Sequence, residues 1–164
     1  MLRRAVHPSW RPFWAGGTSA DGHNVTAPQP EGLGAEQAMR RALDDAGLAP
    51  DAVDGINAHG TGTPVGDRAE AQAIARVFGP DTTVCSTKGA LGHAVAAAGA
   101  LEAAVCVAAL QEGLLPGTVG LQEVDPAFGI GVQAAARQGA PRVLLSNSFG
   151  FGGQNASLVF ATVD

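Results

Sequence analysis

Two histidines and two threonines stand where a chain of this kind can carry out chemistry. In the segment INAHGTGTP, His59 directly follows a short apolar run, and Thr61 and Thr63 follow it between glycines. A histidine at the carboxyl end of a buried strand occupies a position where α/β folds place functional groups. The alternative is a histidine satisfied by nearby backbone, beside threonines that only stabilise the loop.

The second histidine, His93, lies in CSTKGALGH, just before an apolar helix that we expect over residues 94–111. The positive end of a helix disfavours an imidazolium ion, so we expect His93 to be neutral and able to donate a hydrogen bond. Glu102 is the one charged residue of that helix, and an unpaired buried charge costs several kcal/mol. We therefore predict an ion pair between Glu102 and Lys88, which is either purely structural or also orients His93.

A third group is the glycine-rich segment NSFGFGGQN, residues 147–155. Its candidate site residues are Phe149, Phe151, Gly152 and Gly153. Exposed backbone amides in such a turn can form an oxyanion hole, and a phenylalanine can shape an apolar pocket beside it. The alternative is a plain glycine-rich hairpin that joins two strands.

The hydrophobic pattern predicts the elements that position these groups. Helices are expected over 35–46, 67–78 and 94–111, and strands over 53–58, 83–86, 131–136, 142–147 and 156–163. Asp67 and Glu70 have the spacing of a capping box at the start of the second helix. The third helix is apolar on nearly every side, so we expect it to be buried all round. The element order predicts an α/β fold with a mixed sheet whose last strands pair antiparallel.

Residues 1–14 are expected to be irregular or to end in an edge strand, and residues 15–32 have the composition of a loop. Residues 15–164 then form one domain, and 46% hydrophobic residues suffice for a core. The net charge of −5 argues against nonspecific nucleic-acid binding. Two cysteines without metal-ligand spacing indicate a reducing compartment. We expect no membrane span, no secretory signal and a cytoplasmic location.

The three groups together resemble a known family. NAHGTGTP, STKGALGH with the downstream AAAGALEA, and NSFGFGGQN are similar to the three C-terminal signatures of the β-ketoacyl-acyl-carrier-protein synthases, in order and at fitting separations. SADGHNVTAP is similar to a fourth segment. The resemblance covers about Gly16 to Val163, and residues 1–14 match nothing in it. It implies a thiolase-like α/β fold, C-terminal half only, with α-β-α layers and a central buried helix.

The resemblance also implies a reaction, the decarboxylative condensation of malonyl-carrier protein with an acyl thioester in fatty acid or polyketide synthesis. His59 and His93 would be the two catalytic histidines that hydrogen-bond the malonyl thioester oxygen, and Lys88 with Glu102 would hold His93 in place. The residues implied to contact the phosphopantetheine arm or the acyl chain are Thr61, Thr63, Phe149, Phe151, Gly152 and Gly153. Phe151 is the residue expected to gate the acyl chain, and Phe149 is the less favoured alternative for this role.

The reactive cysteine of the family lies in an N-terminal half that this sequence does not contain. Cys85 and Cys106 read as small core residues, and Cys85 as a replacement nucleophile is the less favoured alternative. The expected partners are acyl carrier protein and an N-terminal synthase half or partner chain, in a dimer or higher oligomer, with no metal or cofactor. Two other classes stay open: a non-catalytic remnant that binds carrier protein or a synthase, and a thiolase-fold enzyme that uses coenzyme A.

Overall fold

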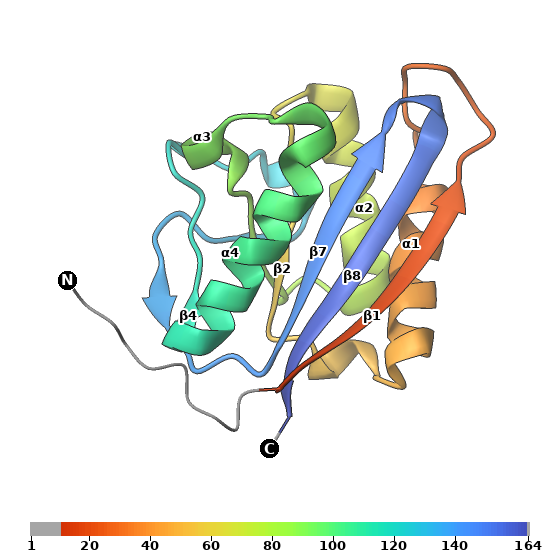
Figure 1. Cartoon of the computed structure of the whole chain (residues 1–164). Helices are drawn as coiled ribbons and strands as arrows, with labels where there is room; N and C mark the ends of the chain where they lie inside the picture. Colours follow the sequence, from red (N-terminus) through yellow and green to blue (C-terminus); the bar gives the residue numbers. More distant parts are fainter. Residues whose placement is uncertain (1–10, 164) are drawn as a thin grey trace.

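The computed structural model describes residues 11–163, with side chains over 14–162. Within these residues, a six-stranded mixed sheet lies between two layers of helices (Figure 1). Its strands, in spatial order, are β1 (Arg11–Ala20), β8 (Gln154–Val163), β7 (Val143–Gly150), β2 (Gly55–Asn57), β3 (Thr83–Cys85) and β5 (Gly131–Val132). β7, β2, β3 and β5 run parallel, whereas β8 is antiparallel to both β7 and β1. The antiparallel pairing predicted for the last two strands is confirmed.

Helices cover both faces of the sheet. α1 (Leu33–Ala46) and α2 (Pro64–Phe78) lie on one face, and α4 (Ala98–Glu112) lies against β7 and β8 on the other (Figure 1). The short α3 (Lys88–Leu91) follows β3. Single 3-10 turns lie at Pro50–Ala52, Val95–Ala97, Pro126–Phe128 and Phe151–Gly153. The α-β-α layering expected from the sequence is present.

Side-chain alternation along β7 and β8 builds a separate core on each face of the sheet. Because successive side chains of a strand point to opposite faces, Leu145 and Val159 pack under α1 and α2, while Leu144 and Phe160 pack under α4. The first core also contains Met39, Ile56 and Ile74, and the second contains Cys106, Leu110 and Leu115. Burial on both faces explains why apolar residues are consecutive at Leu144 and Leu145 of β7 and at Val159 and Phe160 of β8.

The loop predicted over 15–32 is wrong for residues 15–20, which continue β1 as an edge strand. The glycines that suggested a loop serve packing instead. A Cβ at Gly17 would lie 2.2 Å from the carbonyl oxygen of Ala38, so only glycine lets α1 approach β1 this closely. The edge strand expected at the end of residues 1–14 is confirmed for 11–14, and β1 crosses the boundary placed after residue 14. Residues 1–10 lie outside the described residues.

The helix expected over 94–111 begins later, at Ala98, and is not buried all round. Its inward face carries Glu102 and Cys106, but Leu101 is 41% exposed and Val95, just before the helix, is 78% exposed. Among the described residues, the sheet covers only one side of this helix. Val95–Glu112 has the length and mean hydropathy (1.5) of a membrane span, a test that core helices also pass. Its buried glutamate and its packing on β7 suit a core helix.

The predicted strand over 131–136 is only two residues long, β5. Two further short strands were not predicted, β4 (Leu114–Leu115) and β6 (Arg137–Gln138), and they pair antiparallel as a separate two-stranded sheet. Two-residue strands are too short to show an alternation of apolar and polar residues, so the sequence pattern carries no signal for them.

Candidate active site

The candidate site lies where three neighbouring parallel strands end. β2, β3 and β7 are adjacent and parallel, so their carboxyl ends meet at one edge of the sheet. His59 follows β2, Lys88 opens the short helix after β3, and Phe149 lies near the end of β7. The ring centroids of His59 and His93 are 5.6 Å apart and nearly perpendicular, and those of His59 and Phe149 are 5.8 Å apart. Three segments far apart in the sequence therefore converge on His59.

His59 is held as a neutral imidazole. The ammonium nitrogen of Lys88 lies 3.4 Å from its Nδ1. An ammonium group can only donate, so Nδ1 accepts and Nε2 carries the proton. Burial, the positive charge of Lys88 and the proximity of His93, in this order of importance, together lower the pKa of His59 to about 4. At neutral pH His59 therefore offers one N–H donor, at Nε2.

His93 has the same tautomer for a different reason. It lies between α3 and the 3-10 turn at Val95–Ala97, because α4 begins at Ala98 and not directly after His93 as predicted. Its Nδ1 accepts a hydrogen bond from the backbone amide of Val95 at 3.2 Å. In the neutral ring the proton is then on Nε2. This local contact, and not the start of the long helix, orients the imidazole.

The predicted ion pair between Lys88 and Glu102 is confirmed, with side chains 7% and 2% exposed. The second carboxylate oxygen of Glu102 accepts from the hydroxyl of Ser148 at 3.4 Å. A Cβ at Gly99, one turn before Glu102 in α4, would lie 2.9 Å from the hydroxyl oxygen of Ser148. Glycine at this position therefore lets β7 approach α4. We expected the pair to hold His93, but the contact that the structure gives Lys88 is with His59.

Glu70 lies at the candidate site and does not form the capping box predicted for it. α2 begins at Pro64 with Thr63 as its N-cap, so Glu70 forms no capping box with Asp67. The carboxylate of Glu70 is buried and accepts from the backbone amides of His59 and Gly60, both at 2.9 Å. The signal was its spacing: Glu70 precedes the buried residue Ile74 by four positions, which puts it on the inward face of the helix.

Asp67 instead accepts from the backbone amide of Gly62 at 3.2 Å. The hydroxyl groups of Thr61 and Thr63 hydrogen-bond to each other at 2.9 Å at the surface of this loop. Thr61, Lys88 and His93 are among the polar residues that line a cavity of about 510 Å³. Its apolar walls come from Ile74, Val84, Phe128, Ile130 and Val132. The volume of this cavity is in the range of sites that bind small organic ligands. Thr63 does not line the cavity.

The 149–153 turn departs in part from the oxyanion hole that we considered. The amide of Gly152 donates to the carbonyl oxygen of Val25 at 2.6 Å, so it is occupied. The carbonyl oxygen of Gly153 accepts from the amide of Asp21 at 2.8 Å, and Gly153 is buried. The side chain of Phe151 is 81% exposed in this chain. Of the two candidate phenylalanines, Phe149 is the one in contact with a histidine.

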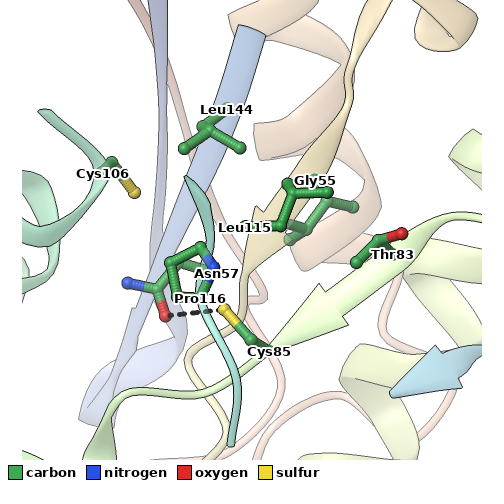
Figure 2. A pocket seen from close by; sticks show the side chains of 9 residues that line it. Gly55, Asn57, Thr83, Cys85, Cys106, Leu115, Pro116 and Leu144 are labelled. Carbon is green, nitrogen blue, oxygen red and sulfur yellow. Dashed lines mark hydrogen bonds between the residues drawn. The ribbon is translucent and has the colours of Figure 1, made fainter. Parts of the chain in front are cut away.

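Both cysteines are core residues. Cys85 and Cys106 line a small cavity of about 10 Å³ between the sheet, α4 and Leu115 (Figure 2). The thiol of Cys85 faces Oδ1 of Asn57 at 4.0 Å. Burial raises the pKa of each thiol to about 12, so neither is a thiolate at neutral pH. Over residues 11–163, no three His, Cys, Asp or Glu side chains gather as a possible metal site.

Fold and site together define an α/β domain of the thiolase-like class, with two neutral histidines at the carboxyl edge of a mixed sheet. Residues 14–122 match the family model described as the C-terminal domain of the β-ketoacyl synthases. The chain belongs to this family.

Named relatives agree with this assignment. The chain is 44% identical over 154 residues to the mitochondrial 3-oxoacyl-[acyl-carrier-protein] synthase of Arabidopsis thaliana, a match that covers 90% of this chain and 33% of that protein. A β-ketoacyl synthase from Burkholderia phymatum superposes with a TM-score of 0.84 at 38% identity, over 92% of this chain and 37% of the other. A type II PKS acyl-carrier protein in complex with its ketosynthase gives a TM-score of 0.87 at 27% identity, over 92% and 38%. The chain spans about a third of the length of the curated relatives it matches.

Proposed function

We propose that this chain supplies the two catalytic histidines of a 3-oxoacyl-[acyl-carrier-protein] synthase. The observation that carries the proposal is the shared tautomer of His59 and His93. Each ring has its Nδ1 engaged as an acceptor, by Lys88 and by the amide of Val95, and each therefore has a free Nε2–H donor. Two neutral donors 5.6 Å apart between ring centroids suit a single oxygen that gains negative charge.

The proposed chemistry follows from those two donors. The Nε2–H groups of His59 and His93 bind the carbonyl oxygen of the malonyl thioester. The bond to the malonyl carboxylate breaks, carbon dioxide leaves, and the electron pair forms an enolate that both donors stabilise. The enolate carbon then attacks the carbonyl carbon of an acyl group held on a cysteine, and the cysteine thiolate leaves. Since an imidazolium would transfer its proton to the enolate, the low pKa of His59 favours the donor role.

The nucleophile in this proposal comes from outside these 164 residues, in a longer polypeptide or on a second chain. Cys85 and Cys106, the two cysteines of the sequence, are buried as neutral thiols. The proposed carrier of both substrates is acyl carrier protein, in line with the similar ketosynthase described in complex with one. Its pantetheine arm would contact Thr61 and Thr63.

In the same proposal Phe149, Phe151, Gly152 and Gly153 form the acyl side of the site. Phe149 lies against His59, whereas the exposed Phe151 would gate the acyl chain once an N-terminal portion covers it. The synthase would act as a dimer or higher oligomer in the cytoplasm, without a bound cofactor.

Reconstitution tests the proposal. Acyl- and malonyl-carrier protein are supplied to this chain alone and then with a cysteine-bearing N-terminal half of a β-ketoacyl synthase. We expect condensation only in the mixture, and its loss on His59→Ala or His93→Ala. Condensation by the chain alone that Cys85→Ala abolishes would make Cys85 the nucleophile. No condensation in the mixture, with carrier protein still bound, would favour a non-catalytic binding module. Activity with coenzyme A thioesters only would indicate a different thiolase-fold enzyme.

A further inference from the structure

We infer that Glu70 and Asn147 are positioning residues that hold the main chain of His59 from inside the core. This inference rests on the proposed function only for the importance of His59. Glu70 contacts no ring atom of either histidine in the contacts described above. It acts through the backbone that carries the imidazole.

Glu70 accepts hydrogen bonds from two successive backbone amides. Its Oε1 accepts from the amide of His59 and its Oε2 from the amide of Gly60, each at 2.9 Å, so a single carboxylate fixes two peptide planes. Gly60 has a φ of +42°, a left-handed conformation that favours glycine. This fixed turn sets the direction in which the chain leaves β2 and the direction in which the His59 side chain points. Burial raises the pKa of Glu70, whereas the hydrogen bonds from Gly60, Asn147 and His59 oppose that rise because they stabilise the ionised form. All three partners are donors, as an ionised carboxylate requires.

Asn147 fixes Glu70 in turn. Its amide nitrogen donates to Oε1 of Glu70 at 3.0 Å, and its Oδ1 accepts from the hydroxyl of Ser157 at 2.7 Å. Asn147 and Ser157 are fully buried on the neighbouring strands β7 and β8. The serine donor therefore sets which way the asparagine amide faces, and the asparagine sets the carboxylate.

β7 thus holds one glutamate on each face of the sheet. Asn147 and Ser148 are consecutive, so their side chains point to opposite faces. Asn147 contacts Glu70 from α2, and Ser148 contacts Glu102 from α4. Glu70 then fixes the main chain of His59, while Glu102 fixes Lys88 against its Nδ1. The imidazole is held from both layers of helices at once.

We call the hydrogen bonds that run from Asn147 through Glu70 to the main chain of His59 the clamp. A variant that weakens these bonds has a predictable effect on the His59 ring. In Glu70→Gln the side chain keeps its shape, but an NH₂ group faces one of the two backbone N–H donors. That peptide must turn, and the His59 ring moves away from Lys88 toward water. The ionisable groups that act on this ring are Lys88 and His93, and neither is altered.

The experiment is an NMR titration of the histidine side chains in the chain of 164 residues, without substrate. For Glu70→Gln we expect the pKa of His59 to rise from about 4 toward its usual 6.5. We also expect the ¹⁵N shifts of its ring to move toward a mixture of tautomers, while those of His93 stay unchanged. The matched control is Glu36→Gln, which removes a glutamate that pairs with Arg40 and Arg76 at the surface and leaves both histidines as they are. A folded Glu70→Gln with wild-type His59 signals would overturn the inference.

A second variant covers the case in which Glu70→Gln does not fold. Ser157→Ala deletes the donor that orients Asn147 and changes only one small side chain. We expect a smaller change of the His59 signals in the same direction, and unchanged signals would contradict the clamp.

With an N-terminal half added, Glu70→Gln should lower kcat for malonyl decarboxylation by up to about 10²-fold with little change in KM, since misplacement of a catalytic group acts on the transition state. Because the titration needs no activity, it separates failure of the clamp from failure of the proposed function.

Discussion

Lys88 lies 3.4 Å from Nδ1 of His59 while it forms an ion pair with Glu102. One buried cation therefore has two roles. It neutralises a carboxylate inside the apolar core, and it fixes the tautomer of a histidine at the candidate site. Both roles can be tested separately.

The first prediction concerns stability. Glu102→Ala leaves the ammonium of Lys88 buried without a counter-charge, so we expect the free energy of unfolding to fall by about 3–5 kcal/mol. Urea denaturation followed by circular dichroism measures it. Glu36→Ala is the control, because it breaks surface ion pairs that are each worth at most about 1 kcal/mol. A loss as small as that of the control would show that the pair is not buried in solution.

A second prediction separates charge from packing. In the double variant Lys88→Met with Glu102→Leu both charges are gone and no buried charge is left unpaired, so much of the lost stability should return. The pKa of His59 should rise in this variant, because the ammonium no longer opposes protonation of the ring, although burial still holds the pKa below its usual value. An NMR titration follows the ring. A His59 pKa that does not change would mean that Lys88 does not face it.

The same shift makes stability depend on pH. The pKa of His59 is about 4 in the folded chain and near 6.5 when the chain is unfolded, so the unfolded state binds more protons between these values. His59 therefore destabilises the fold progressively as pH falls from 6.5 toward 4. We expect the pH dependence of unfolding in this window to be shallower in His59→Gln than in the wild type. Parallel curves would contradict the low pKa.

How far the sequence predicts this site depends on whether the signal is local. The pairing of Glu102 with Lys88 was predictable, because a lone charge in an apolar helix needs a partner and few are near. The role of Glu70 was not, because its spacing from Asp67 also suits a capping box, and its real partners, the amides of His59 and Gly60, depend on how α2 packs against β2. Tertiary contacts overrode the local pattern.

In the fold, too, elements with a local sequence signal were predicted, whereas those set by tertiary contacts were not. Helices and strands with long apolar patterns lie close to their predicted positions, whereas the first residues of the predicted 15–32 loop form a strand. Gly16 and Gly17 were assigned to a loop, but the neighbour that requires glycine at position 17 is the backbone of Ala38 in α1, about 20 residues further along the chain. The contact of Lys88 with His59 rather than His93 is likewise set by the packing of α3 and α4.

The two glycines give a further prediction with an internal control. Gly17→Ala would place a methyl group 2.2 Å from the backbone of Ala38, so α1 must shift, and we expect a loss of at least about 1–3 kcal/mol. Gly16→Ala, one residue earlier and on the other face, meets the flexible side chain of Leu158 at 3.1 Å and should cost less. Thermal unfolding of both variants tests this. Equal losses would mean that β1 does not lie against α1.

The last prediction concerns the uncovered side of α4. The chain of 164 residues leaves Leu101 41% exposed and Val95 78% exposed, and Trp14 of β1 is 65% exposed. Isolated apolar side chains are normal on a surface, but those of Leu101 and its neighbours continue along the outer face of a helix that carries no charge there until its last turn. We expect the isolated chain to self-associate and to bind a hydrophobic dye, because association removes this surface from water. Size-exclusion chromatography with light scattering measures the first effect and dye fluorescence the second.

Leu101→Lys should weaken both without unfolding the chain, since position 101 faces away from the sheet. The matched control, Val119→Lys, changes an exposed apolar residue on another segment and should leave association as it is. A monomer that binds no dye would show that this face is too small or too polar to drive association.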